Sequence, residues 1–524
     1  MSKKFKSKID VQSESFLKNR AEMLKKIKEM RNLEKRSFNA SESKRQKFED
    51  RNQLTPRERL NALIDPDSEF VELYNMAGFL VEDNNPETSI PGASVIAGIG
   101  FIKGVRCMIM VDDSGINAGA ATSTTVDKCV GCLEISLEKK LPFVHLVESA
   151  GINLMNYKVE IWARAGGMFA GLAKLSAAGV PTITILHGLS TAGGAYNVGM
   201  SDYVIGVKKN GMAALAGPAL LKAATNEVAS NKELGGSEMH ATVSGLVEYL
   251  AEDDSDAIDI ARNVLNALDW NSGFSTIKDN DYVEPKYDIN EIAGIVNLDY
   301  KKPYDAREII LRLVDDSSFI EFKPRYGITT LCFQADINGN SCGIIANNGP
   351  IDTDGATKSA QFFQLCDKSD SPIIFLNNVT GFMVGKKYEQ AGMIKHGSKM
   401  IQAVTNITVP KISLYVGASF GAGNYGMCGY AYDPDFLLSW PNAVTGVMGG
   451  QQAASTMAQV MVAAAKKRGD SFDQEQIDQK QKEISKHFDN QSSAFYTSGR
   501  LLDMGIIDPR ETRKVLAFLL QTCK

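Results

Sequence analysis

Two short turns made of small residues have the composition of a site that holds a negatively charged oxygen. The first covers residues 190–196 (STAGGAY), and the second covers residues 419–425 (SFGAGNY). Each follows an apolar run that predicts a strand and precedes a pattern that predicts a helix. Small side chains let a ligand approach the backbone, and the first N–H groups of a helix have no partner within the helix. Both turns can therefore form an oxyanion hole from peptide N–H donors.

The two turns match each other residue by residue. Alignment on their closing tyrosines sets Gly193 opposite Ala422 and Gly194 opposite Gly423. A single turn of this kind is more often an ordinary strand–helix packing turn than a binding site. Two matched turns instead favour a reaction that places negative charge on an oxygen of each of two molecules. We therefore expect these four residues to be catalytic through their peptide N–H groups.

The turns belong to a longer internal repeat. The segment LPFVHLVESAG at 141–151 recurs as SPIIFLNNVTG at 371–381, and VPTITILHGLSTAGGAY at 180–196 recurs as VPKISLYVGASFGAGNY at 409–425. The offset is 230 residues in the first pair and 229 in the second. Such constant spacing indicates one domain that occurs twice in tandem.

Each copy alternates short apolar runs, rich in β-branched residues, with longer stretches of helical periodicity. Apolar runs without strict alternation are typical of parallel strands covered by helices, so the pattern predicts an α/β fold with crossover connections. A polar interval at 273–303 separates the copies. We expect a basic helical N-terminal arm at 1–50, an N-terminal domain at 51–285 and a C-terminal domain at 286–524.

Composition and charge exclude several classes of protein. Apolar residues make up 44% and charged residues 23% of the 524 residues, as in ordinary globular proteins, and no apolar run is long enough to cross a membrane. Residues 1–50 hold 15 Lys and Arg against 8 Asp and Glu, so the remaining 474 residues carry a net charge of −12. That acidic balance does not suit a nucleic-acid-binding protein. The basic arm is expected to be a solvated helix or to dock a partner.

Neither a metal site nor a targeting segment is expected. The eight cysteines do not make a disulfide framework in so long a chain. Only Cys129 and Cys132 have CxxC spacing, and no second pair follows to complete a zinc ribbon. The N-terminus has no secretory signal, and its acidic residues argue against an organelle presequence. We expect a cytoplasmic protein, with the mitochondrial matrix as the alternative.

From about residue 54 to its end, the chain resembles the carboxyltransferase β subunits of biotin-dependent acyl-CoA carboxylases, and among these the methylcrotonyl-CoA carboxylase type. The resemblance rests on long stretches that include GLSTAGGAYNVGMSD, NNVTGFMVGKKYEQAGMIKHGSKM, GASFGAGNYGMCGYAY and WPNAVTGVMGGQQAAS. It implies tandem duplicated crotonase-like domains, each a ββα spiral, which agrees with the internal repeat.

The resemblance also implies a mechanism that needs no side-chain base. Carboxybiotin, carried on a partner subunit or domain, would lose carbon dioxide and leave a ureido enolate that removes a proton from the acyl-CoA. The thioester enolate would then attack the carbon dioxide. Gly193 and Gly194 would hold the thioester oxygen, and Ala422 and Gly423 would hold the ureido oxygen.

Further site residues follow from the same resemblance. On the biotin side the matching positions are Thr380, Gly381, Phe382, Gly421 and Asn424. On the acyl-CoA side they are Gly119, Ala120, Ser149, Ala150 and Gly151.

The resemblance implies several partners. The chain has neither the AMKM-type biotin-acceptor sequence nor the ATP-binding loop of a biotin carboxylase, so it must work with a biotin carboxylase and biotin carrier subunit. In the family the two substrates meet between the N-terminal domain of one subunit and the C-terminal domain of another. A homo-oligomer is therefore expected, a hexamer built as a trimer of dimers, with no nucleic-acid or membrane partner.

The first half departs from the family pattern. Where the family shows GGTYYP and then a basic run, residues 118–132 read AGAATSTTVDKCVGC, and the family's SGGA turn appears as SAGI at 149–152. We therefore expect an acyl group that differs in size or polarity from 3-methylcrotonyl. Neutral drift around an unchanged substrate is the alternative.

Three other functions remain open from the sequence. One is a biotin-dependent acyl-CoA decarboxylase that runs the same chemistry in reverse in a membrane-linked complex. Another is a crotonase-type hydratase or isomerase, which would need a carboxylate near the turn; the nearest ones along the chain are Asp202 and Glu227. The last is a scaffold that keeps the fold without catalysis.

Overall fold

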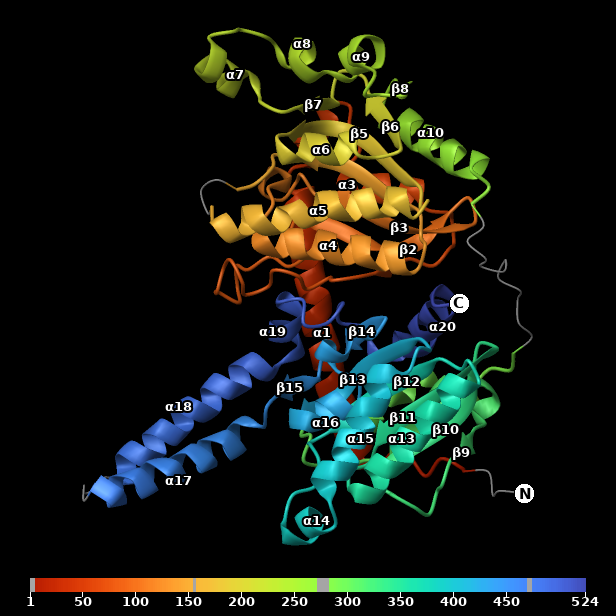
Figure 1. The fold of residues 1–524 in the computed structure, drawn as a ribbon, viewed down its shortest axis with the longest axis vertical. Coiled ribbons are helices and arrows are strands. Elements are labelled where there is room, and N and C mark those ends of the chain that lie inside the picture. Colours follow the sequence, from red (N-terminus) through yellow and green to blue (C-terminus); the bar gives the residue numbers. More distant parts are fainter. Residues whose placement is uncertain (1–4, 154–156, 271–281, 469–473) are drawn as a thin grey trace. The chain divides into compact units, whose positions relative to one another are not determined.

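The computed structural model (Figure 1) contains two compact units. It describes residues 5–153, 157–270, 282–468 and 474–524. Unit 1 comprises Met1–Met30, Thr276–Ser498 and Leu502–Lys524, and unit 2 comprises Arg31–Ser275 and Gly499–Leu501. The long helix α1 (Glu14–Glu42) contributes residues to both units. The domain boundaries expected from the sequence, 1–50, 51–285 and 286–524, stay a prediction.

Unit 2 is built on one mixed sheet in the strand order β1-β2-β3-β4-β5-β6-β8, with β7 paired to β5. The strands are β1 (Val71–Glu72), β2 (Val95–Ile102), β3 (Val105–Asp112), β4 (Phe143–Ser149), β5 (Thr182–Thr191), β6 (Tyr203–Val207), β7 (Met212–Ala214) and β8 (Tyr249–Ala251). The first three pair in antiparallel fashion, whereas β3, β4, β5 and β6 run parallel. The buried central strands explain the apolar runs without alternation.

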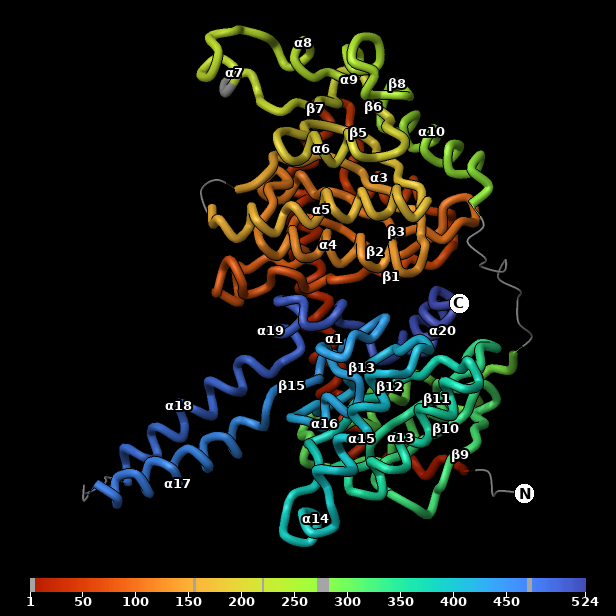
Figure 2. The backbone as a smooth tube through the Cα atoms, viewed as in Figure 1, coloured from red at the N-terminus to blue at the C-terminus, as the bar shows by residue number. Residues whose placement is uncertain are grey.

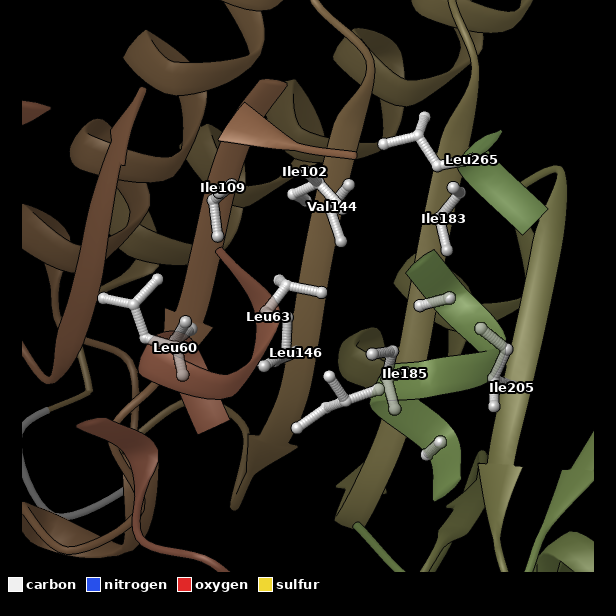
Figure 3. Close-up of a cluster of buried hydrophobic side chains, with 14 of the residues drawn as sticks. Leu60, Leu63, Ile102, Ile109, Val144, Leu146, Ile183, Ile185, Ile205 and Leu265 are labelled. Atoms are coloured by element: carbon white, nitrogen blue, oxygen red, sulfur yellow. The ribbon is translucent and has the colours of Figure 1, made fainter. Parts of the chain in front are cut away.

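Helices connect and cover these strands. Those of unit 2 are α2 (Arg45–Glu49), α3 (Pro56–Leu63), α4 (Ser123–Glu138), α5 (Val159–Ala177), α6 (Gly193–Gly199), α7 (Pro218–Thr225), α8 (Asn231–Gly235), α9 (Ser237–Met239) and α10 (Asp254–Ala267). Buried side chains from α3, α10 and the parallel strands form one cluster (Figure 3), in which Leu60, Leu63 and Leu265 pack with Val144 and Ile183.

Unit 1 repeats this plan. Its sheet has the order β14-β13-β12-β11-β10-β9, with β15 paired to β13. The strands are β9 (Ile320–Glu321), β10 (Thr330–Ile337), β11 (Asn340–Asn347), β12 (Ile373–Val379), β13 (Lys411–Phe420), β14 (Phe436–Ser439) and β15 (Val444–Gly446). Again the first pairs are antiparallel and the later ones parallel. The α/β architecture expected from the sequence is therefore confirmed.

The helices of unit 1 follow the same scheme and add a long hairpin. They are α11 (Ile292–Ile295), α12 (Arg307–Leu313), α13 (Thr353–Lys368), α14 (Lys386–Gln390), α15 (Met393–Asn406), α16 (Gly421–Gly426), α17 (Gly450–Arg468), α18 (Gln474–Ser492), α19 (Ala494–Gly499) and α20 (Thr512–Thr522). Helices α17 and α18 lie side by side and extend together away from the sheet of unit 1 (Figure 2). No helix in the described ranges is long and apolar enough to span a membrane.

The N-terminal arm differs from its expected role. Helix α1 buries an apolar stripe within the chain, formed by Phe16, Met23, Ile27, Met30 and Leu33, each at most 6% exposed. These positions recur at the three- and four-residue spacing of one helix face. The arm is helical as expected, but it is an integral part of the two units rather than a solvated helix or free docking arm.

Candidate active site

The turn expected to bind an oxyanion in unit 2 lies where β5 meets α6. Ala192 has a positive φ angle (54°) and donates its N–H to the carbonyl of Ala214 (3.0 Å). Within the described residues, the N–H groups of Gly193 and Gly194 have no hydrogen-bond partner. A Cβ atom at Gly194 would lie 2.6 Å from Oγ of Ser190, so a larger residue there would have to displace that hydroxyl.

The turn between β13 and α16 in unit 1 has the same form. Gly421 begins the helix with φ 56°. In the part of the chain that the structure covers, Ala422 and Gly423 also have N–H groups without a partner. A Cβ atom at Gly423 would lie 2.8 Å from Cα of Gly381, which brings two of the residues expected on the biotin side together.

A second loop lies beside each turn, at the end of the neighbouring strand. In unit 2 the carbonyl of Gly151 accepts a hydrogen bond from Ala121 N–H (2.8 Å), and in unit 1 the carbonyl of Gly381 accepts one from Ile351 N–H (3.1 Å). Both glycines have positive φ angles, 81° and 127°. The two loops are thus equivalent, as the 230-residue offset predicts.

Most residues expected on the acyl-CoA side lie together. The hydroxyl of Ser149 donates to the carbonyl of Gly119 (2.6 Å) and accepts from Gly151 N–H (3.2 Å). The N–H of Ala150 donates to the carbonyl of Ala118 (3.0 Å). Ala120 is the C-cap of the short 3-10 helix Asn117–Gly119. These contacts fix the loop at the end of β4.

On the biotin side the expected residues differ in their surroundings. Thr380 is exposed at the end of β12. The ring of Phe382 packs against the buried cluster of unit 1. The amide of Asn424 donates to Tyr415 Oη (2.9 Å) and to Ser419 Oγ (2.8 Å). Phe382 and Asn424 therefore hold the turn in place, and a direct contact with biotin stays a prediction.

A buried ionic cluster in unit 2 escaped the sequence analysis. The guanidinium of Arg59 donates to Glu148 Oε2 (2.6 Å) and to Asp254 Oδ2 (2.8 Å), and His187 Nδ1 lies 2.8 Å from Asp254 Oδ1. Burial alone would raise the pKa of Asp254, but His187 and Arg59 outweigh it and hold the pKa at about 2. Because Glu148 precedes Ser149, the cluster anchors the end of β4.

The members of this cluster are distant in sequence, so spacing could not reveal them. The available signal is Arg59, a charged residue directly before Leu60 on the apolar face of α3. A buried arginine needs a carboxylate partner, so a charged residue at this position indicates a buried ion pair.

A cavity of about 640 Å³ opens beside the same loop of unit 2. Its lining includes Ala118, Glu148, Ser149 and Ala150. Cavities of this size commonly take small molecules. The residues expected to bind the acyl-CoA therefore border a space that could hold part of such a substrate.

The two cysteines with CxxC spacing and the imidazole of His240 are buried. Cys129 and Cys132 lie inside α4, and burial raises the pKa of Cys132 to about 12. His240 Nε2 lies 2.7 Å from the carbonyl of Ala213. Among the described residues, no group of three or more His, Cys, Asp or Glu could hold a metal ion.

Comparison with known proteins shows the family to which the chain belongs. Residues 47–522 match the family model described as the carboxyl transferase domain. The chain belongs to the carboxyl transferase family.

Its relatives narrow the class further. The chain is 46% identical over 475 residues to a probable biotin-dependent acyl-coenzyme A carboxylase beta2 subunit of Mycobacterium tuberculosis, covering 90% of this chain and 87% of that protein. It is 41% identical over 519 residues to the mitochondrial methylcrotonoyl-CoA carboxylase beta chain of Dictyostelium discoideum, covering 98% and 87%. It superposes with a TM-score of 0.92, at 44% identity, on the crystal structure of the beta subunit of P. aeruginosa geranyl-CoA carboxylase, covering 99% and 96%.

These findings confirm the resemblance expected from the sequence. The chain is an enzyme, a carboxyltransferase of the β-subunit type found in biotin-dependent acyl-CoA carboxylases.

Proposed function

We propose that this carboxyltransferase moves a carboxyl group from carboxybiotin to the thioester enolate of an acyl-CoA. One observation carries the proposal: two equivalent strand–helix turns each leave adjacent N–H groups without a partner in the described residues. Two such donor pairs suit a reaction in which two different carbonyl oxygens gain negative charge. A hydratase or isomerase, with one substrate, would use only one pair.

In this proposal the turn of unit 2 takes the thioester oxygen, held by Gly193 and Gly194. The turn of unit 1 takes the ureido oxygen of biotin, held by Ala422 and Gly423. The fit to biotin rests on the small residues of this turn and on the N–H groups of Ala422 and Gly423, which have no partner in the described residues. Bound biotin, carried by a partner, supplies the carboxyl group. The chain itself binds, orients and stabilises developing charge.

We also propose that the two units are tandem crotonase-like domains. Support comes from the matching order of strands β1 to β6 in one sheet and β9 to β14 in the other, antiparallel first and parallel later, and from equivalent loops 230 residues apart. Duplication gives each substrate its own turn.

The acyl group is proposed to be bulkier than 3-methylcrotonyl. The ring of Phe169 on α5 contacts Tyr196 edge-on, with ring centroids 5.9 Å apart, and lies near Gly193. Glycines 166 and 167 precede Phe169 on the same helix, and a Cβ at Gly166 would meet no atom within 4 Å. The similarity to a geranyl-CoA carboxylase beta subunit supports a longer branched acyl chain.

The partners proposed are a biotin carboxylase and biotin carrier subunit, with further copies of this chain forming a hexamer. The names of two relatives, each called a beta subunit of a biotin-dependent carboxylase, support a partner subunit that handles biotin. The cytoplasm is the proposed location, and the mitochondrial names of some relatives keep the matrix as the alternative.

The test is carboxylation of a panel of acyl-CoAs by the reconstituted complex. We expect the highest kcat/KM with a branched acyl chain longer than 3-methylcrotonyl. Highest activity on 3-methylcrotonyl-CoA would refute the acyl proposal alone. Absence of bicarbonate fixation on every acyl-CoA, together with decarboxylation of a carboxyacyl-CoA, would instead favour the decarboxylase.

A further inference from the structure

The turn that follows β5 in unit 2 is held by the short strand β7. Strand β7 pairs in parallel with the last residues of β5, so that Ser190 lies opposite Ala213 (Figure 1). Directly after the paired residues, Ala192 donates its N–H to the carbonyl of Ala214 (3.0 Å). Ala192 immediately precedes Gly193, where the candidate oxyanion donors begin. The position of β7 therefore sets the position of the turn.

The other edge of β7 is covered by a chain segment that is not a strand. Within the described residues, β7 makes one antiparallel bridge on this side, between Met212 and Gly236. The carbonyl of Ala213 faces the same segment, because a Cβ atom at Gly235 would collide with its oxygen. A buried carbonyl oxygen without a hydrogen-bond donor would destabilise the strand. The covering segment must therefore supply a donor.

The donor is the imidazole of His240, which is 9% exposed. Its Nε2 lies 2.7 Å from the carbonyl oxygen of Ala213. A carbonyl oxygen only accepts hydrogen bonds, so Nε2 carries the hydrogen. The other ring nitrogen, Nδ1, lies 2.6 Å from Ser244 Oγ, and this second contact fixes the orientation of the ring.

The backbone around His240 has an uncommon form. Residues His240–Ser244 form a short π-helix, and the N–H of Gly245 donates to the carbonyl of His240 (2.9 Å). Single π-turns are rare in proteins and occur frequently at functional sites. Here the wide turn keeps Ser244 within reach of the imidazole.

The corresponding place in unit 1 has a threonine instead of the imidazole. Four residues join β6 to β7 and four join β14 to β15. Strand β15 bridges Ser493 as β7 bridges Gly236, so Thr497 corresponds to His240. The hydroxyl of Thr497 donates to carbonyls of the preceding turn of its own segment. The imidazole is therefore not part of the architecture that the two units share, and it serves the turn of unit 2.

We propose that His240 is a positioning residue for the thioester-binding turn. The inference rests on the proposed function, in which Gly193 and Gly194 hold the thioester oxygen. The imidazole holds Ala213, the pairing of β7 with β5 carries this constraint to Ala192, and the N–H donors follow directly. An oxyanion hole stabilises developing charge because its donors are already in place before the reaction. His240 acts through the backbone of β7 and needs no contact with the substrate.

Two substitutions separate the roles of the two ring nitrogens. The amide nitrogen of glutamine stands as far along the side chain as Nε2 of histidine, whereas that of asparagine reaches only the place of Nδ1. In the reconstituted complex, His240→Asn should lower kcat by about tenfold or more, because displaced donors stabilise the oxyanion less. The KM for acyl-CoA should change by less than about twofold, since the loss falls mainly on the transition state. His240→Gln should restore kcat to within about threefold of wild type.

His487→Asn is the matched control, because this histidine is exposed on α18, and its kcat should stay unchanged. An equal loss of kcat in His240→Asn and His240→Gln would show that the ring only fills space, and it would overturn the inference. A kcat of His240→Asn within about twofold of wild type would overturn it as well. So would a higher KM at unchanged kcat.

Hydrogen exchange resolved by peptide separates this inference from the proposed function. Protection of β7 and of residues 187–192 should fall in His240→Asn and recover in His240→Gln, whereas β13 of unit 1 should not change. Unchanged protection in His240→Asn overturns the inference while leaving carboxylation intact. A wild type that carboxylates no acyl-CoA refutes the proposed function, and the exchange result still decides whether His240 holds the turn.

Discussion

At the scale of single residues, the two candidate turns depend on glycines that leave no room for a methyl group. A Cβ at Gly194 would meet Ser190 Oγ at 2.6 Å, and one at Gly423 would meet Cα of Gly381 at 2.8 Å. Both contacts are far below van der Waals distance. Alanine at position 423 must therefore shift the backbone at Gly381, and alanine at position 194 must displace the hydroxyl of Ser190 beside the turn. Either shift would move the N–H donors away from the developing oxyanion.

We therefore predict that Gly194→Ala and Gly423→Ala each lower kcat by about 100-fold, the usual cost of losing an oxyanion-hole donor. Steady-state carboxylation measures the effect. Gly217→Ala is the control, because a Cβ at Gly217 meets no atom within 4 Å. A loss of kcat below threefold in both turn variants would contradict their proposed role.

A buried carboxyl group in unit 1 gives a prediction for pH. Burial raises the pKa of Asp503 to about 6, although hydrogen bonds from Ser439 Oγ and from the N–H of Gly505 oppose the rise. The unfolded chain keeps an ordinary value near 3.9. Folding therefore favours the protonated form, and the stability that this form provides is complete below about pH 4 and is lost as the pH rises through about 6.

We predict that the local stability of β14 falls by about 3 kcal/mol between about pH 4 and pH 7. Asp503→Asn cannot ionise and should flatten this dependence. Hydrogen exchange of β14 amides, corrected for the intrinsic pH effect, measures it. The same slope in wild type and variant would show that another group titrates.

At the scale of elements, one buried lysine per unit ties a helix to the sheet. Lys128 on α4 donates to carbonyls of Tyr74, Gly92 and Val95, at 2.6 to 3.3 Å. Lys358 on α13, 230 positions later, donates in the same way to Tyr326, Gly327 and Thr330, at 2.8 to 3.5 Å. Both are 0% exposed, and burial lowers the pKa of each ammonium group.

We predict that Lys128→Met and Lys358→Met each destabilise their own unit by about 3 kcal/mol, because three buried carbonyls lose their donor. Hydrogen exchange resolved by peptide should show lower protection in unit 2 for the first variant and in unit 1 for the second. Lys399→Met, at an exposed position of α15, should change neither. Unchanged protection in both buried-lysine variants would show that water replaces the ammonium group at little cost.

At the scale of the whole molecule, the two units have similar sheets but differ in charge at one equivalent turn. The cavity of unit 2 is basic, whereas the equivalent turn of unit 1 carries Trp440 and Pro441 in place of Lys208 and Lys209. Divergence of charge on a shared scaffold fits two substrates of which only one carries phosphate groups.

A higher salt concentration should therefore change the KM for acyl-CoA and leave the KM for biotin nearly unchanged. We predict that raising the ionic strength from about 50 to about 300 mM increases the KM for acyl-CoA several-fold, because exposed charges are screened. The KM for free biotin as carboxyl acceptor in the reverse reaction should change by less than twofold. Equal changes for both substrates would mean that salt alters the complex rather than the basic cavity.

The sequence by itself determined the repeat, the α/β architecture, the family and the two matched turns. These features depend on local composition and on constant spacing, as between the segments that end at Tyr196 and Tyr425, and they can be read along the chain. Strand propensity and small residues at a strand–helix junction act over a few residues only.

Only the tertiary structure decided which distant residues meet. Arg59 finds Glu148 and Asp254 across 89 and 195 positions, and Lys47 shares a cavity with Lys209 and Lys232. It also placed the apolar stripe of α1 inside the chain, where the sequence had suggested a free arm. The physical reason is that burial and electrostatic pairing depend on which residues are close in space. The residues next to a lysine or an amphipathic helix in the sequence do not determine which distant residues it will contact.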